Sequence, residues 1–153
     1  MEWPPRDCAT RERTEILGGE EFLVEKISED SFNDADVVLV AGKEGAKGAS
    51  VTWRAIAESA GAISIDNGKD FRLDPDVPLV VPEINLNAIG PDHRFIASPN
   101  CSTIQIVMVL APLHKIANIK RVVISTYQSV SGWGGRAAQE LLEQMPHALK
   151  SLD

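Results

Sequence analysis

Several features that would assign the chain to a specialised class of protein are missing from its sequence. Its 153 residues include only 2 cysteines, and aromatic residues make up 5%. Two cysteines permit at most one disulfide, which excludes a small secreted domain held together by disulfides. The 15 lysines and arginines are outnumbered by 22 aspartates and glutamates, which leaves a net charge of -7. Because no basic stripe is available to neutralise a phosphate backbone, nucleic acid is not an expected partner.

Long apolar runs are also missing. The longest, from Ile106 to Leu113, is far below the about 18 residues that a membrane-spanning helix needs. The beginning of the chain, MEWPPRDCATRERTE, carries prolines and charges of both signs where a secretory signal requires a basic start and an apolar stretch. We therefore expect a cytoplasmic protein without a membrane partner, in which Cys8 and Cys101 remain unpaired thiols.

The pattern of the remaining sequence predicts an α/β fold. From about residue 19 onward, short β-branched runs alternate with helical stretches, which is typical of βαβ units and a mostly parallel sheet. We expect strands at residues 36–41, 62–66, 79–81, 94–97 and 121–127, and helices at residues 50–60, 103–117 and 136–144. Gly61 is expected to end the first helix. The helix at 103–117 is apolar on nearly every side, which predicts that it is buried, and Pro112 is expected to bend it.

The segment S-P-N-C-S-T places Cys101 where an expected strand is followed by an expected helix. This position lies at the carboxyl edge of a parallel sheet, where open α/β sheets bind ligands. The unpaired N–H groups and the dipole of a helix N-terminus would favour the thiolate over the thiol and make Cys101 a nucleophile. A free cysteine is more often a small buried hydrophobic residue, and from position alone both interpretations stay open.

Three segments of the chain resemble aspartate-β-semialdehyde dehydrogenases, in the order in which that family carries them. The segment SPNCSTIQIVMVLAPLHKIANIKRVVISTYQSVSG, from Ser98 to Gly132, is similar to the family's active-site region. The segments GGEEFLVEKISEDSF, from Gly18 to Phe32, and FRLDPDVPLVVPEIN, from Phe71 to Asn85, resemble the family further upstream. A PNCST run followed at this interval by STYQ-x-VSG is a specific combination. The sequence is therefore identified as resembling this family over most of its length.

The resemblance implies a fold and an activity. The implied fold is an incomplete Rossmann-like parallel sheet with helices, leading into the start of an α+β catalytic and dimerisation domain. The expected boundary makes residues 1–98 a partial dinucleotide-binding domain without the first glycine-rich βα unit, and residues 99–153 the start of the second domain. The implied activity is that of an NADP-dependent oxidoreductase of lysine, threonine and methionine biosynthesis, which converts β-aspartyl phosphate to aspartate semialdehyde and phosphate. The implied assembly is a homodimer or tetramer.

The resemblance also implies roles for individual residues. Cys101 would attack the acyl phosphate, expel phosphate and hold a thioester that a hydride reduces. Asn100 would shape the oxyanion environment. Gln128 would position the substrate beside the sulfur, and Arg72 would bind its phosphate, because a guanidinium forms two parallel hydrogen bonds with a phosphoryl group. Residue chemistry alone also allows Arg72 to brace the turn carboxylates of residues 74 and 76, and Gln128 to cap a loop.

The cofactor site is where the chain departs most from the family. By resemblance, the residues that would contact NADP are Asn67, Ser131 and Gly132. The family's glycine-rich turn has no counterpart, because no G-x-G-x-x-G occurs in the sequence. The evenly spaced Gly42, Gly45 and Gly48 are better explained by a charged surface loop after a strand. Residues 68–70, GKD, and Trp133 stand where the family has small residues. The indole could block the nicotinamide, stack on it or point away.

The general base of the family, a histidine, also has no counterpart in the chain. We expect His93, His114 and His147 to be solvated or structural, and we expect the chain to be truncated at both ends. Arg11 and Arg13 could meet the 2′-phosphate of NADP, although a solvated surface position explains them better. A base within hydrogen-bond reach of the thiol contributes strongly to this kind of catalysis.

Three hypotheses about function remain open. In the first, the chain is part of an aspartate-semialdehyde dehydrogenase and is inactive or weakly active on its own. In the second, it is a non-catalytic relative that acts as an assembly or regulatory subunit and associates through residues 121–127 and the apolar helix. In the third, it resembles an N-acetylglutamyl-phosphate reductase. Asn100 argues against the third hypothesis, because that group carries glycine before the cysteine.

Overall fold

The computed structural model describes residues 13–42 and 48–150 of the chain. The chain divides into two compact units, with the division between Ala111 and Pro112. Cys8, Arg11 and Gly45, on which the sequence analysis touched, lie outside the described residues. Each unit is described by itself below.

An antiparallel hairpin opens the described chain. It consists of β1 (Arg13–Leu17) and β2 (Glu20–Val24), with Leu17 paired to Glu20. The two residues between the strands, Gly18 and Gly19, have φ angles of +62° and +90°. A two-residue turn with positive φ at both positions matches the twist of the strands, and glycine adopts it without strain. The sequence analysis did not predict this hairpin, although a Gly-Gly pair between β-branched and aromatic residues is typical of one.

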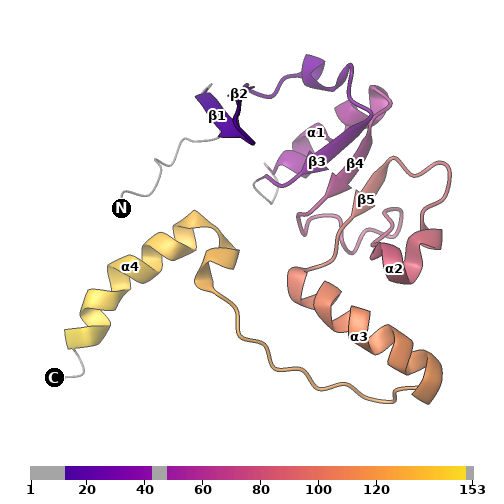
Figure 1. Cartoon of the computed structure of the whole chain (residues 1–153), viewed down its shortest axis with the longest axis vertical. Coiled ribbons are helices and arrows are strands. Elements are labelled where there is room, and N and C mark those ends of the chain that lie inside the picture. The colour runs from indigo at the N-terminus through magenta and orange to yellow at the C-terminus, as the bar shows by residue number, and fades with distance from the viewer. Residues whose placement is uncertain (1–12, 43–47, 151–153) are drawn as a thin grey trace. The chain divides into compact units, whose positions relative to one another are not determined.

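The centre of the first unit is a parallel sheet (Figure 1). Its strands are β3 (Val37–Val40), β4 (Ile63–Asp66) and β5 (Phe95–Ala97), in the order β3-β4-β5. Val37 pairs with Ile63, and Ser64 pairs with Phe95, both in parallel. The crossover from β3 to β4 passes through α1 (Ala49–Ser59). The predicted α/β fold with a parallel, Rossmann-like sheet is confirmed.

The core of this unit lies between α1 and one face of the sheet. Among its buried residues are Ala57 on α1 and Phe95 and Ala97 on β5, and Ala97 is completely buried. Phe32, the last residue of the short helix η1 (Glu29–Phe32), is also buried, and its ring lies 6.0 Å from that of Trp53. Helix α1 ends as predicted, because Gly61 follows it with a left-handed φ of +86° that non-glycine residues seldom adopt.

The chain between β4 and β5 contains little regular structure. Helix α2 (Pro82–Asn85) and helix η2 (Leu86–Ala88) are each a single turn. The strand expected at 79–81 is wrong in extent, because only Leu79 forms a bridge, parallel to Ala97. Pro82 explains why the strand stops, since it has no N–H for a sheet and its fixed φ favours the first turn of a helix. Asn85 closes this turn by accepting a hydrogen bond of 2.8 Å from the Val81 N–H.

Helix α3 (Cys101–Ala117) is present as predicted and continues through Pro112. The prediction that it is buried is wrong, because none of its residues is buried. Val109 is 61% exposed and Ile116 is 86% exposed. An apolar helix is buried only where other elements cover it, and the described residues do not provide that cover. None of the helices within residues 13–42 and 48–150 is long and apolar enough to cross a membrane.

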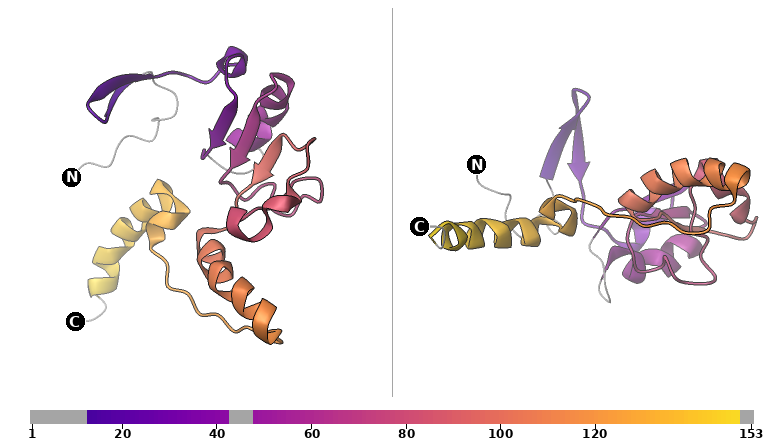
Figure 2. Two further views of the ribbon diagram at one scale, coloured as in Figure 1. Left: turned by 45° about the vertical axis from the view of Figure 1, so that its right-hand side comes forward. Right: turned by 90° about the horizontal axis from the view of Figure 1, so that it is seen from below.

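The second unit contains one long helix. Residues 118–129 form neither helix nor strand and lead to η3 (Val130–Trp133) and α4 (Gly135–Lys150) (Figure 2). The strand predicted at 121–127 is therefore wrong. Backbone N–H and C=O groups of a strand need a neighbouring strand, and none of the described strands pairs with this segment. The last helix begins close to the predicted residue 136 and extends beyond 144.

Candidate functional site

Cys101 is the first residue of α3, and Asn100 caps that helix. The Asn100 carbonyl accepts a hydrogen bond of 3.0 Å from the Ile104 N–H. Its side-chain oxygen accepts a second, also of 3.0 Å, from the Ser102 N–H. Asparagine is among the preferred residues at this position because its side chain satisfies an N–H group that the helix leaves unpaired. The local sequence N-C-S thus fixes where the helix begins and places the cysteine in its first turn.

The thiol of Cys101 is free and exposed. Its Sγ lies 3.9 Å from Oδ1 of Asn100, a long sulfur contact with the capping oxygen. The interpretation of Cys101 as a small buried hydrophobic residue is therefore wrong for this structure. An exposed thiol at the N-terminal turn of a helix is accessible to a substrate and lies where the backbone presents N–H groups.

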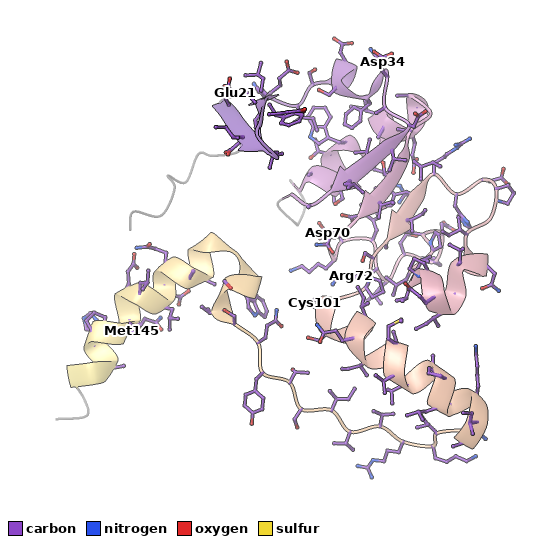
Figure 3. All side chains as sticks on the ribbon, in the orientation of Figure 1. Glu21, Asp34, Asp70, Arg72, Cys101 and Met145 are labelled. Atoms are coloured by element: carbon purple, nitrogen blue, oxygen red, sulfur yellow. The ribbon has the colours of Figure 1, made fainter. Side chains whose placement is uncertain are left out.

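Arg72 lies beside the segment that carries the cysteine. Its Nε donates a hydrogen bond of 2.9 Å to the Ser98 carbonyl, and its Nη2 donates one of 3.0 Å to the Asn67 carbonyl. Ser98 is only three residues before Cys101, so the Cα atoms of Ser98 and Cys101 are at most about 11 Å apart. Figure 3 shows Arg72 and Cys101 at the end of the sheet from which α3 begins.

The alternative role for Arg72, bracing Asp74 and Asp76, is wrong. Asp74 instead accepts a hydrogen bond of 3.0 Å from the Asp76 N–H and lies 3.5 Å from the guanidinium of Arg54. Within the described part of the chain, Arg72 forms no ion pair with a carboxylate. Its two partners are neutral carbonyl groups, and three of its five N–H donors remain for a ligand. A half-buried cation without a counter-charge is suited to an anionic ligand.

Asp66 is a central residue of this region that the sequence analysis missed. It ends β4 and is 1% exposed. Its Oδ1 accepts hydrogen bonds of 2.8 Å from both the Ser50 hydroxyl and the Gly68 N–H. Its main-chain carbonyl accepts a hydrogen bond of 2.8 Å from the Ser98 N–H. Ser50 and Ser98 are distant from Asp66 in sequence, so no local motif could have revealed that both bond to this residue.

Of the residues expected to bind the cofactor, Asn67 lies in the first unit. It follows β4, is exposed, and donates its N–H to the Val40 carbonyl over 2.8 Å. Its position at the carboxyl end of the central strand is where open α/β sheets bind ligands. Gly42, which follows β3, lies so close to α1 that an added Cβ would be 2.7 Å from the Cβ of Ala49. The close approach of Gly42 to Ala49 therefore explains why a residue without a side chain occupies this position.

Gln128, Ser131 and Gly132 lie in the second unit. Gln128 is exposed, and a side chain at Gly132 would collide with its amide. The Ser131 hydroxyl lies 2.9 Å from that of Ser129. Trp133 is 80% exposed, which places its indole in solvent in this structure. The contact with Gly132 gives Gln128 a local packing role beside the one that resemblance implies.

The histidines behave as expected. Nδ1 of His93 accepts a hydrogen bond of 2.7 Å from the Gly90 N–H, which is a structural role in a turn. His147 lies 3.3 Å from the Glu143 carbonyl one turn earlier on α4. Within residues 13–42 and 48–150, the hydrogen-bond partner of the Cys101 thiol is Asn100 rather than an imidazole. These residues therefore provide no histidine base in contact with the sulfur.

An apolar recess of about 180 Å³ lies between α1 and the sheet. Phe32, Trp53 and Phe95 are among its lining residues, and Cys101 is not. We assign it to imperfect packing of the core. The candidate site is instead the carboxyl edge of the sheet, where Asn67, Arg72 and the Ser98–Cys101 segment are joined by hydrogen bonds.

Known protein families and relatives agree with this geometry. A family model described as "Semialdehyde dehydrogenase, NAD binding domain" matches residues 7–91, and one described as "Semialdehyde dehydrogenase, dimerisation domain" matches residues 110–153. Aspartate-semialdehyde dehydrogenase of Prochlorococcus marinus is 46% identical over 131 residues, covering 84% of this chain and 37% of the relative. The enzyme of the same name from Aquifex aeolicus is 43% identical over 129 residues, covering 82% of this chain and 37% of the relative.

Solved structures show the same likeness. The crystal structure of aspartate semialdehyde dehydrogenase II from Vibrio cholerae superimposes with a TM-score of 0.77 at 38% identity, covering 91% of this chain and 41% of that one. This chain thus spans well under half the length of the relatives it matches. The first family model covers more than half of the chain. From this match, the chain belongs to the semialdehyde dehydrogenase family, and the relatives to which it is similar are aspartate-semialdehyde dehydrogenases.

Proposed function

We propose that the chain carries the nucleophile of an NADP-dependent aspartate-semialdehyde dehydrogenase, which converts β-aspartyl phosphate to aspartate semialdehyde and phosphate. The observation that carries this proposal is an exposed, free thiol at the start of α3 together with the guanidinium of Arg72, which is hydrogen-bonded to the same segment and forms no ion pair within residues 13–42 and 48–150. A nucleophile beside a fixed cation suits a substrate that is both an electrophile and an anion. The name of the relatives supports this substrate class.

The reaction uses the residues of this edge in a fixed order. The Cys101 thiolate attacks the acyl carbon and forms a carbon–sulfur bond. The bond between the acyl carbon and the oxygen that bridges to phosphorus breaks, and phosphate leaves with the electron pair of that bond. Arg72 holds the phosphoryl group through its remaining N–H donors and offsets its charge. A bound nicotinamide cofactor would supply a hydride to the thioester carbon. The resulting thiohemiacetal anion, still bonded to Cys101, would release the aldehyde and restore the thiolate. Asn100 supports the oxygen that becomes negative in each step.

NADPH is the proposed hydride donor, and the family model describes an NAD-binding domain. The described residues fit the nicotinamide end of such a cofactor, because Asn67 is exposed at the carboxyl end of the central strand. Ser131 and Gly132 are the proposed contacts from the second unit. The absence of a G-x-G-x-x-G motif removes the usual backbone cradle for the pyrophosphate. We therefore expect turnover by this chain alone to be at or near background.

We further propose that residues 99–153 begin the catalytic and dimerisation domain, with residues 1–98 belonging to the dinucleotide-binding domain. A homodimer or tetramer in the cytoplasm, serving lysine, threonine and methionine biosynthesis, completes the proposal. The match of residues 110–153 to a dimerisation family model supports the assembly. The exposed apolar residues of α4, Leu141, Leu142 and Met145, agree with a surface that a partner covers.

The test compares the chain with a Cys101→Ser variant. In one reaction aspartate semialdehyde, phosphate and NADP are supplied, and NADPH absorbance reports turnover. In a second reaction an acyl phosphate analogue of β-aspartyl phosphate is supplied, and mass spectrometry of the Cys101 peptide reports acylation. We expect a covalent adduct on Cys101 from an activated aspartyl donor such as an acyl phosphate analogue, little NADPH, and neither with Cys101→Ser. An unmodified Cys101 under conditions that acylate a control thiol would overturn the proposal.

An assembly role is the second candidate, favoured by the exposed β-branched residues Val122, Val123 and Ile124. Light scattering combined with the acylation assay distinguishes the two. An oligomer that shields this segment from proteolysis and leaves Cys101 unmodified supports an assembly role, whereas acylation of Cys101 supports the catalytic role in a monomer or an oligomer.

A further inference from the structure

The hydrogen bonds around Asp66 form a closed network at the edge of the sheet that carries the candidate site. The Asp66 carbonyl accepts from the Ser98 N–H, and the Ser98 carbonyl accepts from Nε of Arg72. Nη2 of Arg72 donates to the Asn67 carbonyl, and the next residue, Gly68, donates its N–H to Oδ1 of Asp66. The path thus returns to the residue at which it began. We call these contacts the Asp66–Arg72 network.

We propose that Asp66 is a positioning residue, which holds Arg72 at a set place beside the Cys101 segment through this network. The inference rests on the proposed function, because it concerns the relation between the proposed anion-binding cation and the proposed nucleophile. Asp66 itself is buried, and its carboxylate bonds to Ser50 and Gly68, so its side chain acts on Arg72 through the backbone of the Asn67–Gly68 turn. Ser98 is held separately, by the main-chain carbonyl of Asp66.

The burial of Asp66 argues for a role of this kind. Its Oδ1 is satisfied twice, but its Oδ2 is buried without a hydrogen-bond partner among the described residues. A buried carboxylate oxygen without a partner is unfavourable for folding, and such groups are rare in native structures. Stability alone therefore does not explain why an acid occupies this position. A short, branched acceptor that reaches both Ser50 and Gly68 explains it.

Gly68 shows how little freedom the turn has. An added Cβ at this position would lie 3.0 Å from Oδ1 of Asp66 and 3.4 Å from the Ser50 hydroxyl oxygen. The first distance is tighter than ordinary van der Waals contact, so a side chain would displace the carboxylate or the turn. Because the Asn67 carbonyl in the same turn holds Arg72, a small shift here moves the guanidinium.

The experiment measures the charge preference of the Cys101 thiol. The full chain is alkylated separately with anionic iodoacetate and neutral iodoacetamide, and the labelling rate of the Cys101 peptide is read by mass spectrometry with Cys8 as an internal reference. A unit cation about 10 Å from the sulfur should favour the anionic reagent by between about twofold at the dielectric constant of water and about fifteenfold at an effective dielectric constant of about 20. We expect Arg72→Gln to abolish that preference.

The variants of Asp66 then decide the inference. Asp66→Ala should reduce the iodoacetate preference nearly to the Arg72→Gln value, and combining the two substitutions should add nothing further. Asp66→Asn, whose Oδ1 can accept the same two hydrogen bonds, should restore most of it. Circular dichroism must show that each variant is folded, because unfolding would itself release Arg72 from Ser98 and Asn67 and abolish the preference.

Two glycine variants keep the test decisive if Asp66→Ala does not fold. Gly68→Ala should lower the preference, whereas Gly61→Ala, which strains a left-handed residue with nothing within 4 Å of its added Cβ, should leave it unchanged. A normal preference in folded Asp66→Ala and Gly68→Ala would overturn the positioning role while leaving the proposed function intact. Absence of any Arg72-dependent preference in the unmodified sequence would instead count against the proposed function.

Discussion

The strands of the parallel sheet and the segment at residues 121–127 have similar sequences and opposite structures. VVLV of β3 and RVVISTY are both rich in β-branched residues. The first pairs along its whole length with β4 and has α1 beside it. The second is irregular, exposed throughout, and ends at the fully exposed Tyr127. The difference teaches that β-branched residues form a strand only where a neighbouring strand pairs with them.

The comparison is tested most strongly by truncating one aromatic residue from each region. Phe95 is 2% exposed, and its ring packs edge-on against Phe71 at a centroid distance of 5.0 Å. We expect Phe95→Ala to lower the free energy of unfolding by about 3–5 kcal/mol, because it leaves a cavity in the core. The matched control, Tyr127→Ala, should change it by less than about 0.5 kcal/mol. Urea unfolding followed by circular dichroism measures both, and equal effects would show that residues 121–127 are packed in solution.

Hydrogen exchange compares the two regions without substitution. Amides of β4, between two paired strands, should exchange at least about a hundredfold more slowly than amides of residues 121–127, after correction for intrinsic rates. Peptide-level mass spectrometry resolves the two segments. Strong protection of residues 121–127 in the chain alone would mean that a second molecule supplies the missing strand.

A smaller difference in stability is expected between substitutions of Arg54, which packs on the core, and of Arg121, which lies in the irregular segment. Its guanidinium lies 4.8 Å from the ring centre of Phe71 and 4.9 Å from that of Phe95, and its Nε is 2.9 Å from a Glu58 oxygen. We expect Arg54→Met to cost about 1–2 kcal/mol of stability, since both cation–π contacts disappear. Arg121→Met, at an exposed position, is the control and should be nearly neutral. Thermal unfolding of both variants measures the difference. Equal losses of stability would contradict a stabilising role for the cation–π contacts of Arg54.

The smallest expected difference concerns a glycine that ends a helix. Gly61 has a φ of +86° and open space around it, so Gly61→Ala should cost about 1 kcal/mol through backbone strain alone. Gly134, before α4, has a similar φ of +88°. Because α4 lies in the other unit, Gly134→Ala should lower helix content by circular dichroism and leave the urea midpoint of the sheet region in place. A shift of that midpoint would show that the two units unfold together.

The parts of the fold that could be predicted from sequence are those whose causes are local. The strand at 62–66, the helix that Gly61 ends and the helix that Asn100 begins all follow from short patterns of apolar, capping and turn residues. The exposed thiol at the start of α3 belongs to the same group. Its position was predicted, while its exposure could be learned only from the structure.

The remainder depends on residues that are distant in sequence or on cover that the described chain does not supply. Ser50, Asp66 and Ser98 meet at the edge of the sheet only because three strands are parallel and adjacent. The burial of α3 was predicted from its composition, but composition shows only what a helix could bury and not what covers it. The same reason accounts for the missing strand at 121–127.

The unshielded sulfur of Cys101 also has a consequence for anyone who handles the protein. Peroxide or dissolved oxygen can convert such a thiol to sulfenic acid, and two chains can then become linked through their sulfurs. Because Sγ is exposed and, among the described residues, contacts the capping amide at 3.9 Å, this damage should leave the circular dichroism spectrum unchanged. A preparation stored without reductant would look intact by that measure and would nevertheless have lost its proposed nucleophile.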